Sequence, residues 1–373
     1  MEHTGVTPSG AVLAPDLADL VSGPGPFATV YVTTESGIDN AAQRSEQHWK
    51  VLRGELVEAG APEEVLRPID GVVPGAHLRG QGLGAVAAAG DVFHVEHSPE
   101  PPPRDRATWA PLPALVPMIA WRQSHPAHVA VLADRTGADL FVFRHDAVDL
   151  HAESGGADDP LAKSSAGGWS QPRYQRRAEN TWEHNADDVA VDVTTLVDRF
   201  DARLAVAAGD VRALELIRAA LPERVAERFE VIDGGRSEDG SDEEFARGVH
   251  GHLAGAVATD TMQLVARFRE ELGQGDRAAD GPEATLAALA RAQVEVLLVH
   301  EDLEDDPKAL FGPEPTHVGL RPDELAAMGV DAPTEARLVD VAVRAALGTG
   351  AGIRVVPAGD APTAGVGAVL RWA

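Results

Sequence analysis

Apolar residues along this chain recur at two spacings, one typical of buried strands and one typical of amphipathic helices. The run Phe27–Thr33 (FATVYVT) is almost continuously apolar, which predicts a buried strand. Residues 40–59 place Trp49, Leu52 and Leu56 at helical spacing and predict a helix with one apolar face. The N-terminal part is therefore expected to mix strands and helices.

The middle of the chain has the clearest strand and helix patterns. Residues 128–133 and 138–143 flank the turn Asp134-Arg135-Thr136-Gly137 and predict an antiparallel hairpin, because Asp and Gly are favoured in such turns. Residues 148–152 predict a third strand. The further predicted strands are 204–208 and 229–232, and the predicted helices are 174–200, 211–221 and 242–272. Together these elements predict helices packed on a mixed sheet.

The last part of the chain predicts a smaller α/β domain. The polar, glycine-rich stretch 273–281 is the best candidate for a linker. Beyond it the predicted helices are 283–291 and 334–347, and the predicted strands are 294–299, 353–356 and 367–372. We therefore expect an α/β protein of three domains, with boundaries at 1–126, 127–275 and 276–373.

Composition narrows the classes of function. The chain has 373 residues, a formal net charge of -27 and no cysteine. The absence of cysteine excludes disulfides, thiol catalysis and zinc sites that need thiolates. The acidic balance disfavours non-specific adhesion to nucleic acid or anionic membranes. No apolar run reaches the ~18 residues of a membrane span, and the N-terminus does not read as a signal peptide. We expect a cytoplasmic monomer without membrane contact.

One segment opposes this acidic background. Residues 163–177 contain Lys163, Arg173, Arg176 and Arg177 and no acidic residue, a local charge of +4. A glycine pair and two aromatic residues lie within the same segment. Cations bind phosphate and aromatic rings stack on bases, so this basic loop is expected to contact a structured RNA. A flexible, merely solvated connection is the alternative.

The order of these pieces resembles the middle domain of the class-1 release factors of eukaryotes and archaea. In that family a hairpin, a further strand and a Gly-Gly-Gln-Ser loop precede a long helix that begins with Arg and Phe. Here Gly167-Gly168-Trp169-Ser170 stands at the place of that loop, and Arg173-Tyr174 follows like the Arg-Phe pair.

The C-terminal part resembles the same superfamily. Residues 285–289, which lead into the strand 294–299, are similar to its third domain, and the glycine-rich end 365–372 is similar to the closing strand of release factors and Pelota. The resemblance covers residues 127–373 and implies a three-domain, release-factor-like architecture. The bacterial members of this superfamily include the hibernation factor Balon and its actinobacterial relatives. The composition, rich in Ala, Gly, Arg and Asp, fits an actinobacterial source, so the resemblance is expected to be closest to these relatives.

The departures from the family pattern imply a change of function. The family's glutamine positions the water that cleaves peptidyl-tRNA, whereas the indole of Trp169 donates one hydrogen bond and accepts none. Gln171 lies two residues further on, and a shift of two residues in a loop would aim its amide away from the position of the family's glutamine. The stop-codon motif Asn-Ile-Lys-Ser is also absent. The resemblance therefore implies a non-enzymatic factor of the ribosomal A site that acts in hibernation or stress.

The expected partners are ribosomal RNA in the A site and, in addition, elongation factor Tu and tRNA. The alternative is a tRNA-cleaving or ribosome-rescue factor that uses the same loop, with Gln171, Gln175 and His184 as the only nearby groups for proton transfer. No cofactor, metal or catalytic residue is predicted. The predicted RNA-binding residues are Lys163, Gly167, Gly168, Trp169, Ser170, Gln171, Arg173, Tyr174, Arg176 and Arg177.

Three other motifs suggest chemistry but have simpler explanations. In His94-Val95-Glu96-His97, a strand would turn His94 and Glu96 to one face and His97 to the other, so a metal site is not expected. Residues 348–352 (GTGAG) follow a helix and precede a strand, which indicates a helix end and not a phosphate loop. The acidic residues 301–306 lack the spacing of a calcium loop. A small-molecule enzyme is a further rival without a catalytic set.

Overall fold

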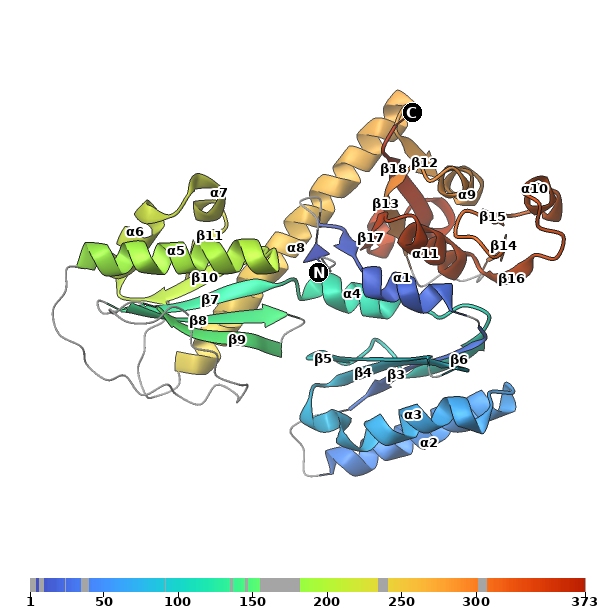
Figure 1. Cartoon of the computed structure of the whole chain (residues 1–373), viewed down its shortest axis with the longest axis horizontal. Helices are drawn as coiled ribbons and strands as arrows, with labels where there is room; N and C mark the ends of the chain where they lie inside the picture. Colours follow the sequence, from blue (N-terminus) through green and yellow to red (C-terminus); the bar gives the residue numbers. More distant parts are fainter. Residues whose placement is uncertain are drawn as a thin grey trace. The chain divides into compact units, whose positions relative to one another are not determined.

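The computed structural model describes residues 5–6, 10–23, 25–34, 40–90, 92–134, 137–144, 147–154, 182–233, 241–300 and 307–372. Its contacts divide the chain into two compact units. Residues 124–259 form the middle unit, and residues 1–123 together with 260–373 form the terminal unit (Figure 1). The predicted α/β class is confirmed, because each unit combines sheets with helices.

The middle unit is built on a five-stranded mixed sheet with the strand order β11-β10-β7-β8-β9. Its strands are β7 (His128–Asp134), β8 (Gly137–Arg144), β9 (Ala147–Ser154), β10 (Leu204–Gly209) and β11 (Phe229–Val231). The first three are antiparallel neighbours, as the turn residues predict, whereas β10 runs parallel to β7 and to β11. The three predicted strands before the basic loop are thus confirmed.

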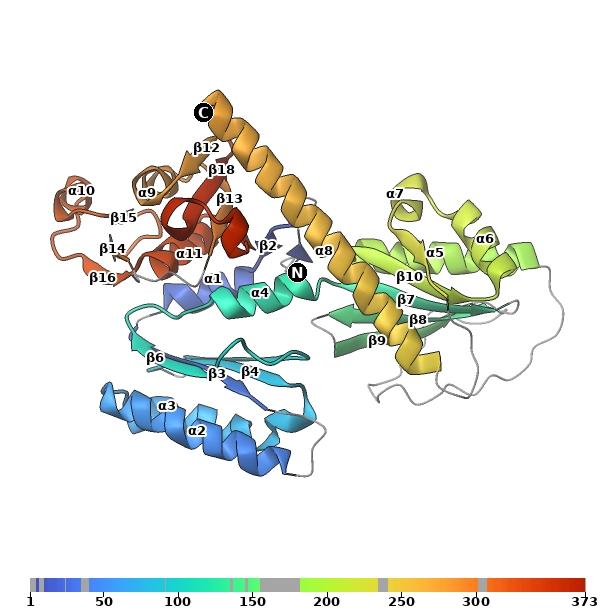
Figure 2. The same ribbon diagram turned by 180° about the vertical axis from the view of Figure 1, so that it is seen from behind.

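Helices cover both faces of this sheet. One face packs against α5 (Trp182–Phe200), α6 (Val211–Ala220) and α7 (Glu223–Ala226), which share one apolar core with alternate residues of the strands. The other face packs against the start of α8 (Ser241–Gln274) (Figure 2). Asp210 caps α6 by accepting hydrogen bonds from two backbone N–H groups of its first turn.

The N-terminal layer of the terminal unit is an antiparallel sheet with the order β5-β4-β3-β6. Its strands are β3 (Phe27–Thr33), β4 (Gly82–Ala88), β5 (Val92–Ser98) and β6 (Arg106–Ala110). Alternate residues of β3 face opposite cores, because side chains alternate along a strand. One core is covered by α2 (Ala41–Glu58), α3 (Glu63–Val72) and the short helix η1 (Val73–Leu78), and the other by α1 (Pro15–Ser22) and α4 (Val116–Ser124).

The C-terminal layer is a six-stranded sheet with the order β1-β2-β17-β13-β18-β12. Two of its strands come from the N-terminus, β1 (Gly5–Val6) and β2 (Val12–Leu13), so segments from both ends of the chain share one sheet. The other strands are β12 (Ala278–Asp280), β13 (Val294–Val299), β17 (Gly352–Val355) and β18 (Val366–Leu370), which pack with α9 (Pro282–Ala290) and α11 (Leu338–Gly348). A continuous apolar core therefore joins the two layers.

A small excursion of the C-terminal layer contains a three-stranded sheet in the order β15-β14-β16. Its elements are β14 (Lys308–Phe311), β15 (Val318–Gly319), α10 (Pro322–Ala327) and β16 (Thr334–Arg337), and two short helices follow later, η2 (Ala358–Asp360) and η3 (Thr363–Gly365).

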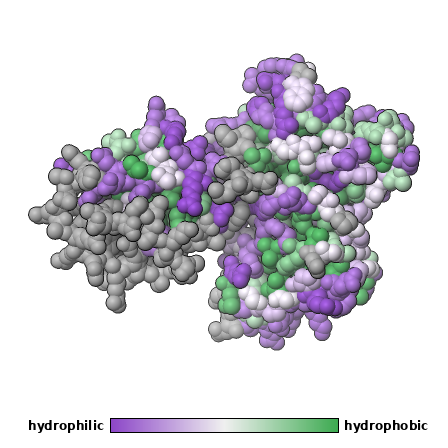
Figure 3. All heavy atoms as spheres, in the orientation of Figure 1, coloured by the Kyte–Doolittle hydropathy of each residue, from purple (hydrophilic) through white to green (hydrophobic). Residues whose placement is uncertain are grey.

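Polar side chains cover much of the outer surface of the layer formed by α2 and α3 (Figure 3). None of the helices within the described residues is long and apolar enough to span a bilayer.

Two details of the predicted elements are wrong. Residues 334–337 form strand β16 and not the first turn of a helix, because β14 provides a partner strand for them. The expected linker 273–281 contains β12, which pairs with β18. The division into domains 1–126, 127–275 and 276–373 stays a prediction, and the structure adds that the first and last segments share one compact unit.

A buried arginine fastens three distant segments of the terminal unit together. Arg354 on β17 is fully buried, and its guanidinium donates to the carbonyl of Gly10 and to the hydroxyl of Thr261 on α8. Asp260, also buried, lies beside them. Gly10 has a φ of 72°, a left-handed conformation that glycine adopts at little cost.

We expect the substitution Gly10→Ala to destabilise the protein. An added Cβ would lie 2.5 Å from Cβ of Asp260 and 3.0 Å from Nη1 of Arg354, and the left-handed backbone alone costs alanine about 1–2 kcal/mol. Gly54→Ala is the matched control, because Gly54 lies inside α2 with no atom within 4 Å of a Cβ, so this change should be neutral or stabilising. Chemical denaturation of both variants measures the difference, and equal stability of the two would contradict the prediction.

Candidate functional site

All ten predicted RNA-binding residues, from Lys163 to Arg177, lie outside the described residues. Gln171 and Gln175 lie there as well, and His184 stands in α5 with its side chain undescribed. The structure does describe the two elements on either side of the basic loop. Strand β9 ends at Ser154 and α5 begins at Trp182.

The strand before the basic loop is fastened to the helix after it. Ser154 pairs with Ala138 across β8 and β9, and its hydroxyl donates to Oδ2 of Asp192 on α5 at 2.5 Å. Because Ser154 is the last residue of β9, this hydrogen bond joins the end of the strand to the body of α5. The middle unit thus holds both flanks of the segment 155–181 on packed secondary structure.

A small hollow of the middle unit lies at the turn between β7 and β8. It is lined by Asp134 and Gly137 of the hairpin, by Asn185 of α5 and by Ala213 and Ile217 of α6. Most of its lining is small or apolar. Among the described residues this hollow brings together no pair of groups suited to proton transfer, so it supports no catalytic assignment.

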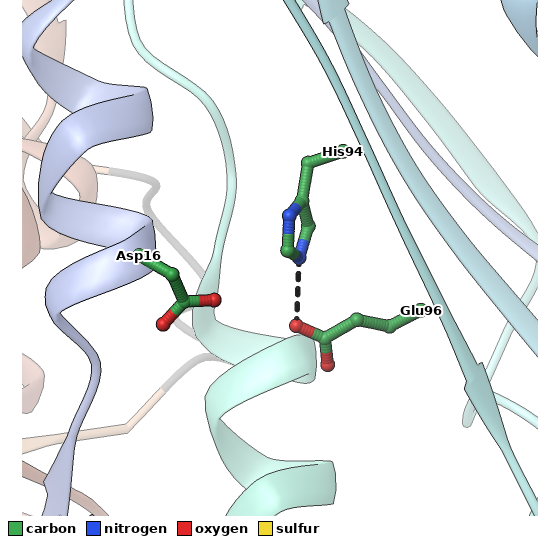
Figure 4. A group of neighbouring side chains, drawn as sticks. All are labelled: Asp16, His94 and Glu96. Carbon is green, nitrogen blue, oxygen red and sulfur yellow. Dashed lines mark hydrogen bonds and ion pairs between the residues drawn. The ribbon is translucent and has the colours of Figure 1, made fainter. Parts of the chain in front are cut away.

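The most concentrated group of charged side chains lies in the terminal unit. Asp16 of α1 and His94 and Glu96 of β5 have ligand atoms within 4.8 Å of one another, as Figure 4 shows. His94 Nε2 is 2.8 Å from Oε1 of Glu96, so both side chains lie on one face of the strand, as the alternation predicted. Asp16, far away in sequence, was not expected in this group.

Arg122 of α4 occupies the centre of this cluster. Its guanidinium donates to both carboxylate oxygens of Asp16, at 2.9 and 2.6 Å, and its Nε donates to Oε1 of Glu96 at 2.9 Å. A further hydrogen bond joins Nη2 to the same oxygen of Glu96. Only 4% of the Arg122 side chain and 13% of the Glu96 side chain are exposed, whereas 40% of the Asp16 side chain is, so one buried cation pairs with an inner and an outer carboxylate.

The pKa shifts agree with this pairing. Burial raises the pKa of the Glu96 carboxyl. The hydrogen bond from His94 and the charge of Arg122 lower this pKa by more than burial raises it, so the net pKa is below its ordinary value. For Asp16 burial also raises the pKa, and the hydrogen bonds and charge of Arg122 lower it by more. Burial lowers the pKa of Arg122, and its two carboxylate partners raise it by more. All three groups stay ionised at neutral pH.

This arrangement answers the question of a metal site. Asp16, His94 and Glu96 are of the types that bind divalent cations, but the guanidinium of Arg122 already takes both carboxylates. A cation at their centre would meet a fixed positive charge. We therefore assign the cluster to ion pairing that joins α1, β5 and α4. The expectation that His94 and Glu96 hold no metal stays a prediction.

Of the other sequence motifs, the structure describes the stretch 348–352 and His97 but not the acidic stretch 301–306. Helix α11 ends at Gly348 and β17 begins at Gly352, and Gly350 has a φ of 68°, so the stretch 348–352 is the predicted helix end and connection. His97 lies on the other face of β5 from Glu96, and burial together with the charge of Arg79 lowers its pKa. The acidic stretch 301–306 lies outside the described residues.

Comparison with protein families gives a match in the middle of the chain. Residues 127–274 match the model of the bacterial archaeo-eukaryotic release factor family 2. These residues contain all strands and helices of the middle unit and the whole segment 155–181. The match confirms that residues 127–274 resemble the archaeo-eukaryotic release factors. A special closeness to Balon stays a prediction.

Similar proteins cover almost the whole chain. The chain is 29% identical over 365 residues to "Uncharacterized protein Rv2629" of Mycobacterium tuberculosis, and the match covers 95% of each chain. Among solved structures it is similar to Archaeoglobus fulgidus Pelota, with 16% identity, a TM-score of 0.31 and coverage of 78% and 80% of the two chains. An archaeal Pelota described as ribosome-bound has 15% identity, a TM-score of 0.41 and coverage of 100% and 99%.

The ion-paired cluster predicts a dependence of stability on pH. The pKa values of Asp16 and Glu96 are lower in the folded than in the unfolded protein, so their contribution is present above about pH 4–5 and is lost as the pH falls further. Glu96→Gln should cost about 2 kcal/mol at pH 7, and this difference should shrink as the pH falls below 4. Urea denaturation of both proteins from pH 7 to 3 measures it, and a constant difference would contradict the assigned ion pair.

Proposed function

We propose that this member of the archaeo-eukaryotic release-factor and Pelota superfamily is a ribosome-binding translation factor that occupies the A site without releasing the nascent peptide. The observation that carries the proposal is the family match of residues 127–274, which includes the entire basic loop. The middle unit supports it, because β9 and α5, which precede and follow the segment 155–181 in the chain, belong to one packed unit and are joined by a hydrogen bond.

The chemistry of the loop fits ribosomal RNA. Its charge of +4 contrasts with a net charge of -27 for the chain, so positive charge that can attract phosphate is concentrated in this segment. Arg173, Arg176 and Arg177 would contact phosphate, and Trp169 or Tyr174 would stack on a base, an interaction worth about 1–3 kcal/mol per base. The acidic body would face solvent or a basic ribosomal protein.

Trp169 argues against peptidyl-tRNA hydrolysis. It stands where the family's loop has glutamine, and an indole offers no acceptor for a water molecule. A factor that fills the A site without releasing the peptide would keep a ribosome idle. We therefore propose a role in hibernation or stress, as a cytoplasmic monomer delivered with elongation factor Tu and able to contact tRNA. Rescue of stalled ribosomes and tRNA cleavage are the alternatives, and the last experiment of this subsection tests tRNA cleavage.

The triple substitution of Arg173, Arg176 and Arg177 by alanine should abolish most ribosome binding without unfolding the protein. Each lost phosphate contact removes about 0.7–0.9 from the slope of log affinity against log salt, so the slope should fall by about 2–3. Sedimentation with vacant ribosomes at several salt concentrations, with and without elongation factor Tu, measures this.

The matched control replaces three exposed arginines of the middle unit outside the loop, Arg212, Arg218 and Arg247, by alanine. This variant has the same net charge as the loop variant. It should bind ribosomes like the unchanged protein. Equal loss in both variants would show a general charge effect, and no loss in either would refute the role of the loop.

The unchanged protein should release no formylmethionine from ribosomes carrying formylmethionyl-tRNA, and the tRNA should stay intact. The physical reason is the absence of an acceptor at position 169. Released formylmethionine and the length of the tRNA can be measured in the same reaction, with a bacterial release factor and a stop codon as the positive control. Peptide release would overturn the proposal, and shortened tRNA would establish the nuclease alternative.

A further inference from the structure

The terminal unit is made of two separate stretches of the chain that share one core. Residues 1–123 and 260–373 form this unit, and residues 124–259 are inserted between them. The shared core combines Tyr31 of β3 with Ala342 of α11. Helix α1 of the first stretch packs on α11 of the second (Figure 1 and Figure 2). The terminal unit therefore forms only when the two stretches meet.

Both connections to the inserted middle unit are fastened to neighbouring residues of strand β17. Gln123 is the last residue before the insertion, and its side-chain amide donates to the carbonyl of Val355 and accepts from the N–H of Val355, both at 2.9 Å. Thr261, the second residue after the insertion, accepts a hydrogen bond from the buried guanidinium of Arg354. Because Arg354 and Val355 are adjacent, the folded terminal unit holds the two ends of the insertion at one strand.

The middle unit fixes its own two ends on one sheet. Where the chain enters this unit, the carbonyl of Ala127 accepts a hydrogen bond from the N–H of Arg203 at 2.7 Å, and β7 then pairs with β10. Where the chain leaves it, Val249 and Leu253 of α8 pack on a face of that sheet. The same helix continues to Phe268, which packs in a core of the terminal unit. A folded middle unit thus keeps its two ends at a set separation.

An unfolded insertion would oppose the assembly of the terminal unit. Closing a flexible loop costs conformational entropy that grows with the logarithm of the loop length. For a loop of about 100 residues this cost lowers the equilibrium constant for closure by about a thousandfold. The folded middle unit removes most of the cost, because its own cores already hold the two ends of the insertion.

We infer that the middle unit is a folded strut that joins the two stretches of the terminal unit, so that a gain or loss of stability in the middle unit passes to the terminal unit. A partner that binds only the folded middle unit would thereby also stabilise the core shared by β3 and α11. The strut is a property of the free protein, so it does not depend on the proposed ribosomal role.

Single cysteines can follow the two units separately, because the chain contains no cysteine of its own. Val343→Cys places a buried thiol in the terminal core on α11, and Val193→Cys places one in the middle core on α5. In each of these proteins Leu196→Ala then removes a fully buried side chain of α5 and leaves a cavity in the middle core. Where the middle thiol still stays protected, Phe229→Ala is added. Labelling with iodoacetamide without denaturant measures how often each core opens.

Once the middle thiol reacts freely, the thiol on α11 should react about a hundred- to a thousandfold faster than in the protein with an unchanged middle core. Val191→Ala is the matched control, because it shortens an exposed side chain of the same helix α5, and it should change neither rate. An unchanged rate on α11 beside an unfolded middle unit would overturn the strut. An equal rise in the control would overturn it as well, since the rise would then not follow the loss of the middle core.

Discussion

The terminal unit depends on the burial of one cation. A guanidinium without solvent must have its donors met by protein groups, because an unpaired buried charge costs several kcal/mol. Arg354 therefore holds in place the segments that provide its acceptors, namely Gly10 beside the N-terminal strand β2 and Thr261 on α8. Arg122 repeats this principle between α1, β5 and α4. Both arginines join segments that are distant in sequence.

Local patterns of the sequence were sufficient for most elements. The strand Phe27–Thr33, the hairpin around residues 134–137 and the helix within 40–59 lie where the spacing of apolar residues and the turn chemistry predicted them. Two kinds of information were missing. Residues 334–337 have helical neighbours in sequence but a strand partner in β14, and β12 was read as a linker because its partner β18 lies far along the chain. Pairing over long distances leaves little trace in local periodicity.

The side-chain clusters were also hard to predict from sequence, because their members come from segments that are distant in the chain. Alternation along a strand correctly placed His94 and Glu96 on one face. It could not show that Asp16 and Arg122 would join them from two helices, and it is Arg122 that changes a metal-like group into an ion-paired one. The basic loop was proposed from its charge contrast and from its resemblance to the release-factor loop, and its role in binding stays a prediction.

The pairing of β2 with β17 has a consequence for the order in which the protein folds during its synthesis. A ribosome makes Val12 early and Ile353 some 340 residues later, and these two residues are neighbours in the sheet. Strand β2 must therefore wait for β17 through almost the whole of synthesis, paired only with its neighbour β1, while residues 124–259 can complete their own sheet and core in the meantime. The six-stranded sheet that both ends of the chain share can therefore be completed only after the middle unit has been made.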